Sequence, residues 1–275
     1  MTGATLTKIS KKELIDFLEG LDIQVKTSTK ARGHQGFFFK NRIDVSRHLH
    51  EERAVEVLVH EFAHYIHSKI DTDIYKSGGS LEKIFDLEDI EQIKKELLLV
   101  TSIVDKNSRH TTLKRLKNQV NLEIKELQEF IQLDYPNFMR SKKFKEFDRY
   151  IRFSKAKYLL KYDRVTLLSP FLKKKTILSV DSVTSDFTDM PKSFAAYIKL
   201  KSLQRKQARV SRRINKLNKY YSRPSELFAR LVEGLFVDME KIFEIAPASC
   251  ERFFDLLNDG YYLEMRDFFE LTRIV

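Results

Sequence analysis

The stretch VLVHEFAHYI, at residues 57–66, carries the most specific pattern in this 275-residue chain. His60 and His64 are four residues apart, so on a helix they lie on one face, one turn apart, and both imidazoles can reach the same zinc ion. Glu61 follows the first histidine and is placed to take a proton from a water molecule beside that metal. The apolar neighbours predict that the rest of the helix is buried. The stretch therefore predicts a zinc-binding helix with a catalytic base, against the simpler interpretation of a buried helix with two chance histidines.

A catalytic zinc site needs a third protein ligand, and the sequence offers several candidates. Glu226 is preferred, because it begins a mostly apolar helix in which an unpaired carboxylate would be costly. The alternative role for Glu226 is that of an acid at a helix N-terminus, where the helix dipole favours negative charge. His67 lies about 10 Å along the helix axis from His60, so we expect it to have a supporting or surface role. Three nearer acids stand in a segment with many charges of both signs, which is more typical of a solvated helix face: Glu82, Glu88 and Glu91.

Turn residues and hydrophobic spacing around the histidine helix predict an α+β chain that is predominantly helical. The histidine helix is expected at 51–68, after a helix at 10–19 and three short strands at Ile23–Thr27, Gly36–Lys40 and Arg42–Ser46. The absence of glycine between Ser80 and Glu233 favours long helices in the following region. The later elements are expected in this order: helices at 87–106, 109–133 and 137–162, a hairpin between Arg164 and Val180 around Ser169-Pro170, a long basic helix after Pro191, a helix at Arg223–Val237, and short helices within 249–274.

Charge divides the chain into a basic middle and an acidic frame. Residues 108–220 hold 28 Lys and Arg against 10 Asp and Glu, although the whole chain carries a net charge of only +11. The stretch Ser77-Gly78-Gly79-Ser80 is the best candidate for a flexible break before this region. We therefore predict a small core made of residues 1–76 and 220–275, interrupted by a basic helical insertion at residues 80–219.

The insertion ends in a tract, residues 192–219, with ten basic residues and no acidic one. Its positions 201, 205, 209, 212, 216 and 219 recur at helical spacing, so one side of the predicted helix is strongly positive. Such a side is suited to a nucleic acid backbone or to an acidic protein partner. The simpler interpretation is a solvated face, or one that faces the acidic frame of the same chain. No recognised DNA-binding motif accompanies the charge.

Composition limits the class of protein and its compartment. The single cysteine, Cys250, excludes an intramolecular disulfide framework and a multi-cysteine zinc ribbon. No apolar run approaches the ~18 residues of a membrane helix, and the first residues lack the apolar stretch of a signal peptide. We therefore expect a soluble, cytoplasmic protein with no membrane partner.

Other polar side chains are weaker candidates for a role at the metal. Tyr220 and Tyr221 precede the Glu226 helix, so either hydroxyl is a candidate donor to an oxyanion; ordinary half-buried tyrosines are the alternative. Three further histidines lie on or near the connection between the strands and the histidine helix, where we expect them at the surface: His34, His48 and His50.

The order of strands, histidine helix and later glutamate helix resembles that of the zincin metallopeptidases, specifically the gluzincin type with two histidines and a glutamate. The segment RPSELFAR, at residues 223–230, further resembles zincin domains encoded by phages and other mobile genetic elements. The resemblance covers roughly residues 10–70 and 215–240, and its first motif is the more specific one.

The resemblance implies that Zn2+ is bound by His60, His64 and Glu226 and that Glu61 is the catalytic base. It also implies that the strand around Arg42–Ser46 is the edge strand with which an extended peptide substrate pairs. The leading hypothesis is thus a zinc-dependent endopeptidase that acts on a protein or peptide. The alternative is a zincin-like binding protein, active or not, whose basic insertion holds nucleic acid or an acidic protein; a structural protein with chance histidines is the third.

Overall fold

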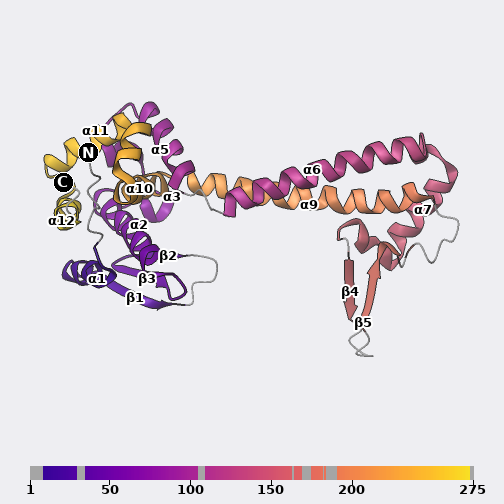
Figure 1. Cartoon of the computed structure of the whole chain (residues 1–275), viewed down its shortest axis with the longest axis horizontal. Helices are drawn as coiled ribbons and strands as arrows, with labels where there is room; N and C mark the ends of the chain where they lie inside the picture. Colours follow the sequence, from indigo (N-terminus) through magenta and orange to yellow (C-terminus); the bar gives the residue numbers. More distant parts are fainter. Residues whose placement is uncertain are drawn as a thin grey trace, which may run out of the picture. The chain divides into compact units, whose positions relative to one another are not determined.

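The computed structural model describes residues 9–29, 35–104, 109–162, 164–168, 175–181, 183 and 191–272. The chain is predominantly helical, and the strands of its described residues lie in two small sheets, in agreement with the predicted α+β class (Figure 1). The chain divides into two compact units. Unit 1 comprises Met1–Lys106 and Asn218–Val275, and unit 2 comprises Asn107–Leu217.

Unit 1 begins with a capped helix, α1 (Lys11–Gly20), and a three-stranded sheet. β1 (Gln24–Thr29), β2 (Gly36–Phe39) and β3 (Arg42–Ser46) are arranged in the order β1-β3-β2, with β1 parallel and β2 antiparallel to β3. The expectation that the strand at Arg42–Ser46 is an edge strand is therefore wrong. Its last four residues are all buried, as in a strand with neighbours on both sides, and β1 and β2 occupy the two edges.

The histidine motif lies on α2 (Glu51–Ile70), whose residues 57–67 are all buried. α2 packs against β2 and β3. Gly36 in β2 permits this close packing, because a Cβ atom at that position would lie 2.4 Å from Val57 Cγ1 and 2.6 Å from Glu61 Oε1. Any side chain at position 36 would force the strand and the helix apart.

α10 (Pro224–Ile245) packs against both α2 and α5 (Glu91–Val104) in the centre of unit 1. Pro224 occupies the first turn, where its fixed φ suits a helix and its missing N–H costs no hydrogen bond. Residues 225–236 of α10 are all buried, including three charged side chains among the apolar ones. The aromatic-rich helices α11 (Pro247–Asn258) and α12 (Leu263–Thr272) complete the core of this unit.

The first boundary of unit 2 lies at residues 106–107, not at residues 77–80 where we expected a break. Gly78 and Gly79 have φ values of 91° and 78° and join two short helices of unit 1, α3 (Ile74–Ser77) and α4 (Leu81–Phe85). A Cβ atom on Gly79 would lie 2.1 Å from His67 Nε2. These glycines therefore serve a tight, packed turn and do not mark a linker between units.

The packing of α5 explains why the charged segment after Gly78 and Gly79 belongs to unit 1. Its residues Ile93, Leu97 and Val100 are buried in the core of that unit. Its buried Glu96 accepts hydrogen bonds of 2.7 Å from both the backbone N–H and the hydroxyl of Ser249, at the N-terminus of α11. The apolar spacing decides the placement of this helix, and its other charged residues, Glu91, Lys94 and Lys95, are exposed.

Unit 2 is built on two antiparallel helices, α6 (Arg109–Asp134) and α9 (Lys192–Tyr221) (Figure 1). The last four residues of α9 belong to unit 1. Asn121 accepts a hydrogen bond of 2.6 Å from Gln207, and Asp134 accepts one of 3.1 Å from the backbone of Ser193. Near the other end of the pair, the side chains in contact are apolar: Leu113, Val210 and Ile214.

The expectation of a single helix at 137–162 is wrong, because two serines interrupt the helical segment. The structure has a 3-10 helix η1 (Phe138–Arg140), α7 (Lys142–Phe153) and a second 3-10 helix η2 (Lys155–Leu160). Ser141 and Ser154 accept backbone hydrogen bonds and cap the two later segments.

A two-stranded antiparallel sheet of β4 (Arg164–Leu168) and β5 (Lys175–Ser179) follows, as the predicted hairpin requires; Ser169-Pro170 lies outside the described residues. None of the helices among the described residues combines the length and the apolar character needed to cross a bilayer.

Candidate metal centre

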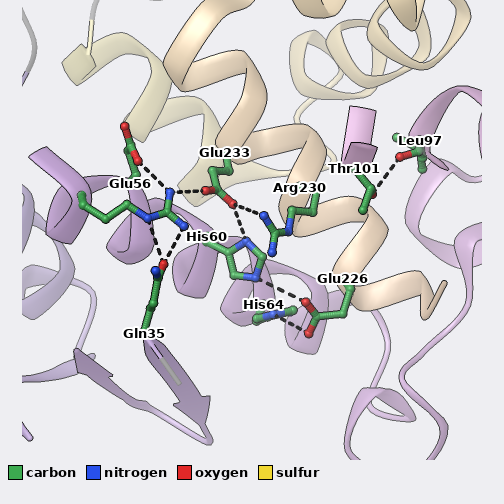
Figure 2. A network of polar contacts seen from close by, with 10 residues as sticks. Gln35, Glu56, His60, His64, Leu97, Thr101, Glu226, Arg230 and Glu233 are labelled. Carbon is green, nitrogen blue, oxygen red and sulfur yellow. Dashed lines mark hydrogen bonds and ion pairs between the residues drawn. The ribbon is translucent and has the colours of Figure 1, made fainter. Parts of the chain in front are cut away.

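Three buried side chains from α2 and α10 meet at one point (Figure 2). His60 Nε2 lies 3.6 Å from Glu226 Oε2, and His64 Nε2 lies 3.4 Å from Glu226 Oε1. The two imidazole rings are 5.0 Å apart and nearly perpendicular, as the four-residue spacing on one helix face predicts. One ligand atom from each of the three residues lies within 4.8 Å of the other two, a separation that one metal ion can span.

The chemistry of this cluster fits zinc. Two imidazole nitrogens and a carboxylate oxygen are a common three-ligand set for a catalytic zinc ion. Glu226 Oε2 is buried and has no hydrogen-bond partner in the described part of the chain, since the 3.6 Å contact with His60 is too long for one. A buried carboxylate oxygen without a partner is costly, and coordination to a cation would offset that cost.

Glu233 forms a hydrogen bond with Nδ1 of His60, the ring nitrogen that does not face Glu226. His60 Nδ1 lies 2.9 Å from Glu233 Oε2 (Figure 2). The other oxygen of Glu233 accepts a hydrogen bond of 2.8 Å from Arg53. Arg230 lies 3.6 Å from the same carboxylate. When Nδ1 carries the proton, Nε2 presents its lone pair toward Glu226, which is the tautomer that a metal ligand requires. This is the carboxylate–histidine arrangement that orients metal-binding imidazoles.

The role of Glu233 was missed in the sequence, although a signal was present. Glu226, Arg230 and Glu233 are spaced by four and three residues, so they lie along one face of α10. They are the only charged residues in the otherwise apolar or small stretch 225–236. Charged residues that keep helical spacing inside a buried helix indicate a polar site between helices, and all three could have been named from that pattern.

Charge compensation is strong in this cluster. Burial alone would lower the pKa of His60, but the neighbouring carboxylates of Glu226 and Glu233 outweigh burial and raise it to about 10. Burial opposes ionisation of both carboxylates, yet the histidines hold the pKa of Glu226 well below its usual range, and His60 brings that of Glu233 to about 2. Without metal, a proton on His60 balances two buried anions, and a bound cation would replace that proton.

Glu61 lies beside the three-residue cluster and is not one of its members. Its side chain is buried against Gly36 of β2, and burial raises its pKa. The charges of both histidines act on the pKa of Glu61 in the opposite direction. A carboxylate with a raised pKa next to a metal position has the property that a general base needs.

The two tyrosines differ in their surroundings. Tyr220 is 37% exposed, and its partial burial, followed by the negative charges of Glu226 and Glu61, raises its pKa. The ring of Tyr221 covers the guanidinium of Arg230 at 5.5 Å. Tyr220 is therefore the better candidate for a hydrogen-bond donor at the site, and Tyr221 packs on Arg230.

The other sequence candidates lie outside the cluster. His67 is fully buried, not at the surface; burial lowers its pKa to about 3, so it is neutral. Glu82, in the first turn of α4, accepts a hydrogen bond from Ser80, the residue before that helix. Glu91 is an exposed residue in the first turn of α5. The remaining candidates are three exposed residues, Glu88, His48 and His50, and one residue outside the described part of the chain, His34.

No protein-family model, no curated protein and no solved structure matches this chain. The chemistry of the site therefore has to be argued from the residues themselves.

We expect Glu233→Gln to weaken zinc binding by about 10- to 100-fold, because the amide has no charge with which to fix the His60 tautomer and raise its basicity. Competition of the metal-loaded protein with a chromophoric zinc chelator measures this. Glu240→Gln, an exposed position of α10 beyond its kink at Asp238, is the matched control and should leave affinity unchanged. Equal affinities for the two variants would contradict a role for Glu233 in metal binding.

Proposed function

We propose that this chain is a zinc-dependent metallopeptidase of the gluzincin type, which hydrolyses peptide bonds in a protein or peptide. One observation carries the proposal: Glu226, 162 positions beyond His64, lies with both motif histidines inside a 4.8 Å cluster. A buried helix with chance histidines gives no reason for a carboxylate from another helix to meet them. The carboxylate of Glu233 on His60 adds the outer contact that metal-binding imidazoles usually make.

In this proposal His60, His64 and Glu226 hold the zinc ion. When bound, zinc supplies Lewis-acid activation of a water molecule and of the substrate carbonyl. Glu61 takes the proton that the attacking water releases and delivers it to the leaving amine. Tyr220 donates a hydrogen bond to the negative charge that develops on the carbonyl oxygen. Glu233 keeps His60 oriented throughout, and the buried setting of these groups strengthens each electrostatic contact.

β2 provides a place for an extended substrate. It is the end strand of its sheet, so one edge has no strand neighbour among the described residues. Gly36 on this strand packs directly against Glu61, which brings the strand edge next to the proposed base. A peptide added to β2 would receive main-chain hydrogen bonds and present its backbone beside Glu61. The edge strand of the proposal is thus Gly36–Phe39 and not Arg42–Ser46.

Metal analysis of the purified protein tests the proposal first. We expect about one zinc per chain in the wild type and almost none in the His60→Ala, His64→Ala double variant. The matched control is the His48→Ala, His50→Ala double variant, which removes two exposed histidines near the same helix and should keep its zinc. Zinc retained at full stoichiometry without His60 and His64 would overturn the metal site.

Hydrolysis is tested next with a library of internally quenched peptides and an unfolded protein. Activity should disappear when a chelator removes the metal and return on addition of zinc. A protein that holds one zinc at His60 and His64 but cleaves no member of the library would favour the alternative of a zincin-like binding protein.

A further inference from the structure

The second half of α9 presents a continuous basic face in unit 2. Five exposed residues form it, and we call them the α9 basic face: Arg205, Arg209, Arg212, Arg213 and Lys216. The spacing of Arg205, Arg209, Arg212 and Lys216 by four, three and four residues places them in one stripe about 16 Å long. The opposite side of the same turns carries Val210 and Ile214, which pack against Leu113 of α6.

No ion pair between a described carboxylate and this face is present. α9 holds ten basic residues and no acidic one from Lys192 to Tyr221. Within the described residues, none of the five side chains forms an ion pair with a carboxylate. So many like charges on one helix repel one another and lower the stability of the free protein. An anionic partner would relieve that repulsion.

An exposed tyrosine, Tyr162, adjoins the α9 basic face, and a second, Tyr158, precedes it by four residues. The Arg209 guanidinium lies 5.0 Å from the ring of Tyr162, and Arg209 also donates a hydrogen bond of 3.1 Å to the backbone carbonyl of Lys161. One turn earlier, Lys157 lies over the ring of Tyr158 at 5.5 Å. Tyr162 is 50% exposed and Tyr158 is 38% exposed. The ring of Tyr162 therefore stands at the border of the cationic stripe, and the ring of Tyr158, four residues earlier in the chain, lies beside a further positive charge.

The combination of a cationic stripe and exposed rings favours one class of partner. Protein interfaces place apolar groups at their centre and deplete charges there, whereas the α9 basic face has cations along its length and no large apolar side chain among the five. Phosphates of a nucleic acid match such a stripe. The rings can stack on bases, but only where the bases are unpaired and accessible.

We propose that unit 2 binds single-stranded nucleic acid, with phosphates along the α9 basic face and bases stacked on Tyr158 and Tyr162. The binding surface lies wholly in unit 2 and does not involve the metal centre of unit 1. The proposal is therefore independent of the peptidase activity and holds or fails without it.

Fluorescence anisotropy of the full-length protein with a labelled 20-nucleotide oligothymidylate tests the proposal. The logarithm of affinity should fall linearly with the logarithm of NaCl concentration between 50 and 200 mM. The triple variant Arg205→Glu, Arg212→Glu, Lys216→Glu should bind at least about 100-fold more weakly and with a shallower salt slope. The matched control reverses three exposed lysines of unit 1, Lys12, Lys26 and Lys95, to glutamate and should change affinity by less than about threefold.

A second variant tests the aromatic part. Tyr162→Ala should lower affinity for oligothymidylate about tenfold and have little effect on binding to heparin, which has no bases. Tyr75→Ala in unit 1 is the control, since this ring has the same 50% exposure. Circular dichroism of each variant establishes that the helices remain folded.

Three results would overturn the proposal. Equal losses in the two triple variants would mean that only net charge matters. Binding of polyglutamate as tight as that of oligothymidylate would indicate an acidic protein as the partner. A 20-base-pair duplex bound as tightly as the single strand, with no effect of Tyr162→Ala, would exclude base stacking.

Discussion

Glu226→Ala is expected to weaken zinc binding by at least about tenfold and to abolish peptide hydrolysis. The substitution removes the only anionic ligand of the proposed set and leaves a zinc ion with two imidazoles. It also removes the negative charge that faces both histidines at 3.4 and 3.6 Å. Affinity is measured by chelator competition and activity with the best quenched peptide of the library.

Two further variants make this experiment specific. Glu240→Ala removes an exposed carboxylate from α10 beyond its kink at Asp238 and should change neither quantity. Glu226→Asp should keep part of the metal affinity but lose turnover, because its shorter side chain holds the metal in a different place. Normal zinc affinity in Glu226→Ala, together with a loss in Glu88→Ala or Glu91→Ala, would assign the third ligand to the nearer segment.

The part of the site that depends on one helix could be predicted from the sequence. The four-residue spacing of His60 and His64 fixes their common face wherever the helix lies, and α2 has the expected position to within two residues. Glu226 could be proposed because the cost of a carboxylate in an apolar helix is also a local argument. Whether these three residues bind a metal is still a prediction.

Contacts that depend on how elements pair could not be predicted in the same way. Glu233 reaches His60 only because α10 crosses α2 in one particular register, and no local spacing specifies that register. The strand order likewise depends on how the elements pair, because β3 follows β2 in sequence but lies between β1 and β2 in the sheet. The burial of all residues from Ile43 to Ser46 reflects neighbours on both sides, which an alternating pattern in five residues does not reveal.

The boundary of unit 2 was misplaced for a related reason. Glycine pairs and dense charge are typical of linkers, but Gly78 and Gly79 serve a turn packed against His67 and Arg223. The apolar residues of α5 at helical spacing were the stronger signal, because burial of an apolar face contributes more free energy than the solvation of surface charges.

Glu61→Gln is expected to retain the zinc of the wild type and to lower turnover by at least about 100-fold. Glutamine has nearly the same size as glutamate, so it fits against Gly36 without disturbing the strand or the helix. It cannot take a proton, and general-base catalysis typically contributes 10²- to 10⁴-fold. Glu52→Gln, an exposed position in the first turn of the same helix, is the control and should be fully active. Loss of zinc in Glu61→Gln would instead make Glu61 a ligand.

The pH profile distinguishes the role of Glu61 further. Burial raises the pKa of Glu61 above its usual value of 4.5, so in the wild type the base becomes protonated at a higher pH than an exposed glutamate would. The rate constant kcat/KM should therefore fall as pH decreases through this raised pKa, because protonated Glu61 cannot accept the proton of the attacking water. The residual activity of Glu61→Gln should lack this acidic limb at pH values where zinc is still bound. An unchanged acidic limb in Glu61→Gln would show that another group, with its own titration, limits the reaction, and Glu61 would then not be the base.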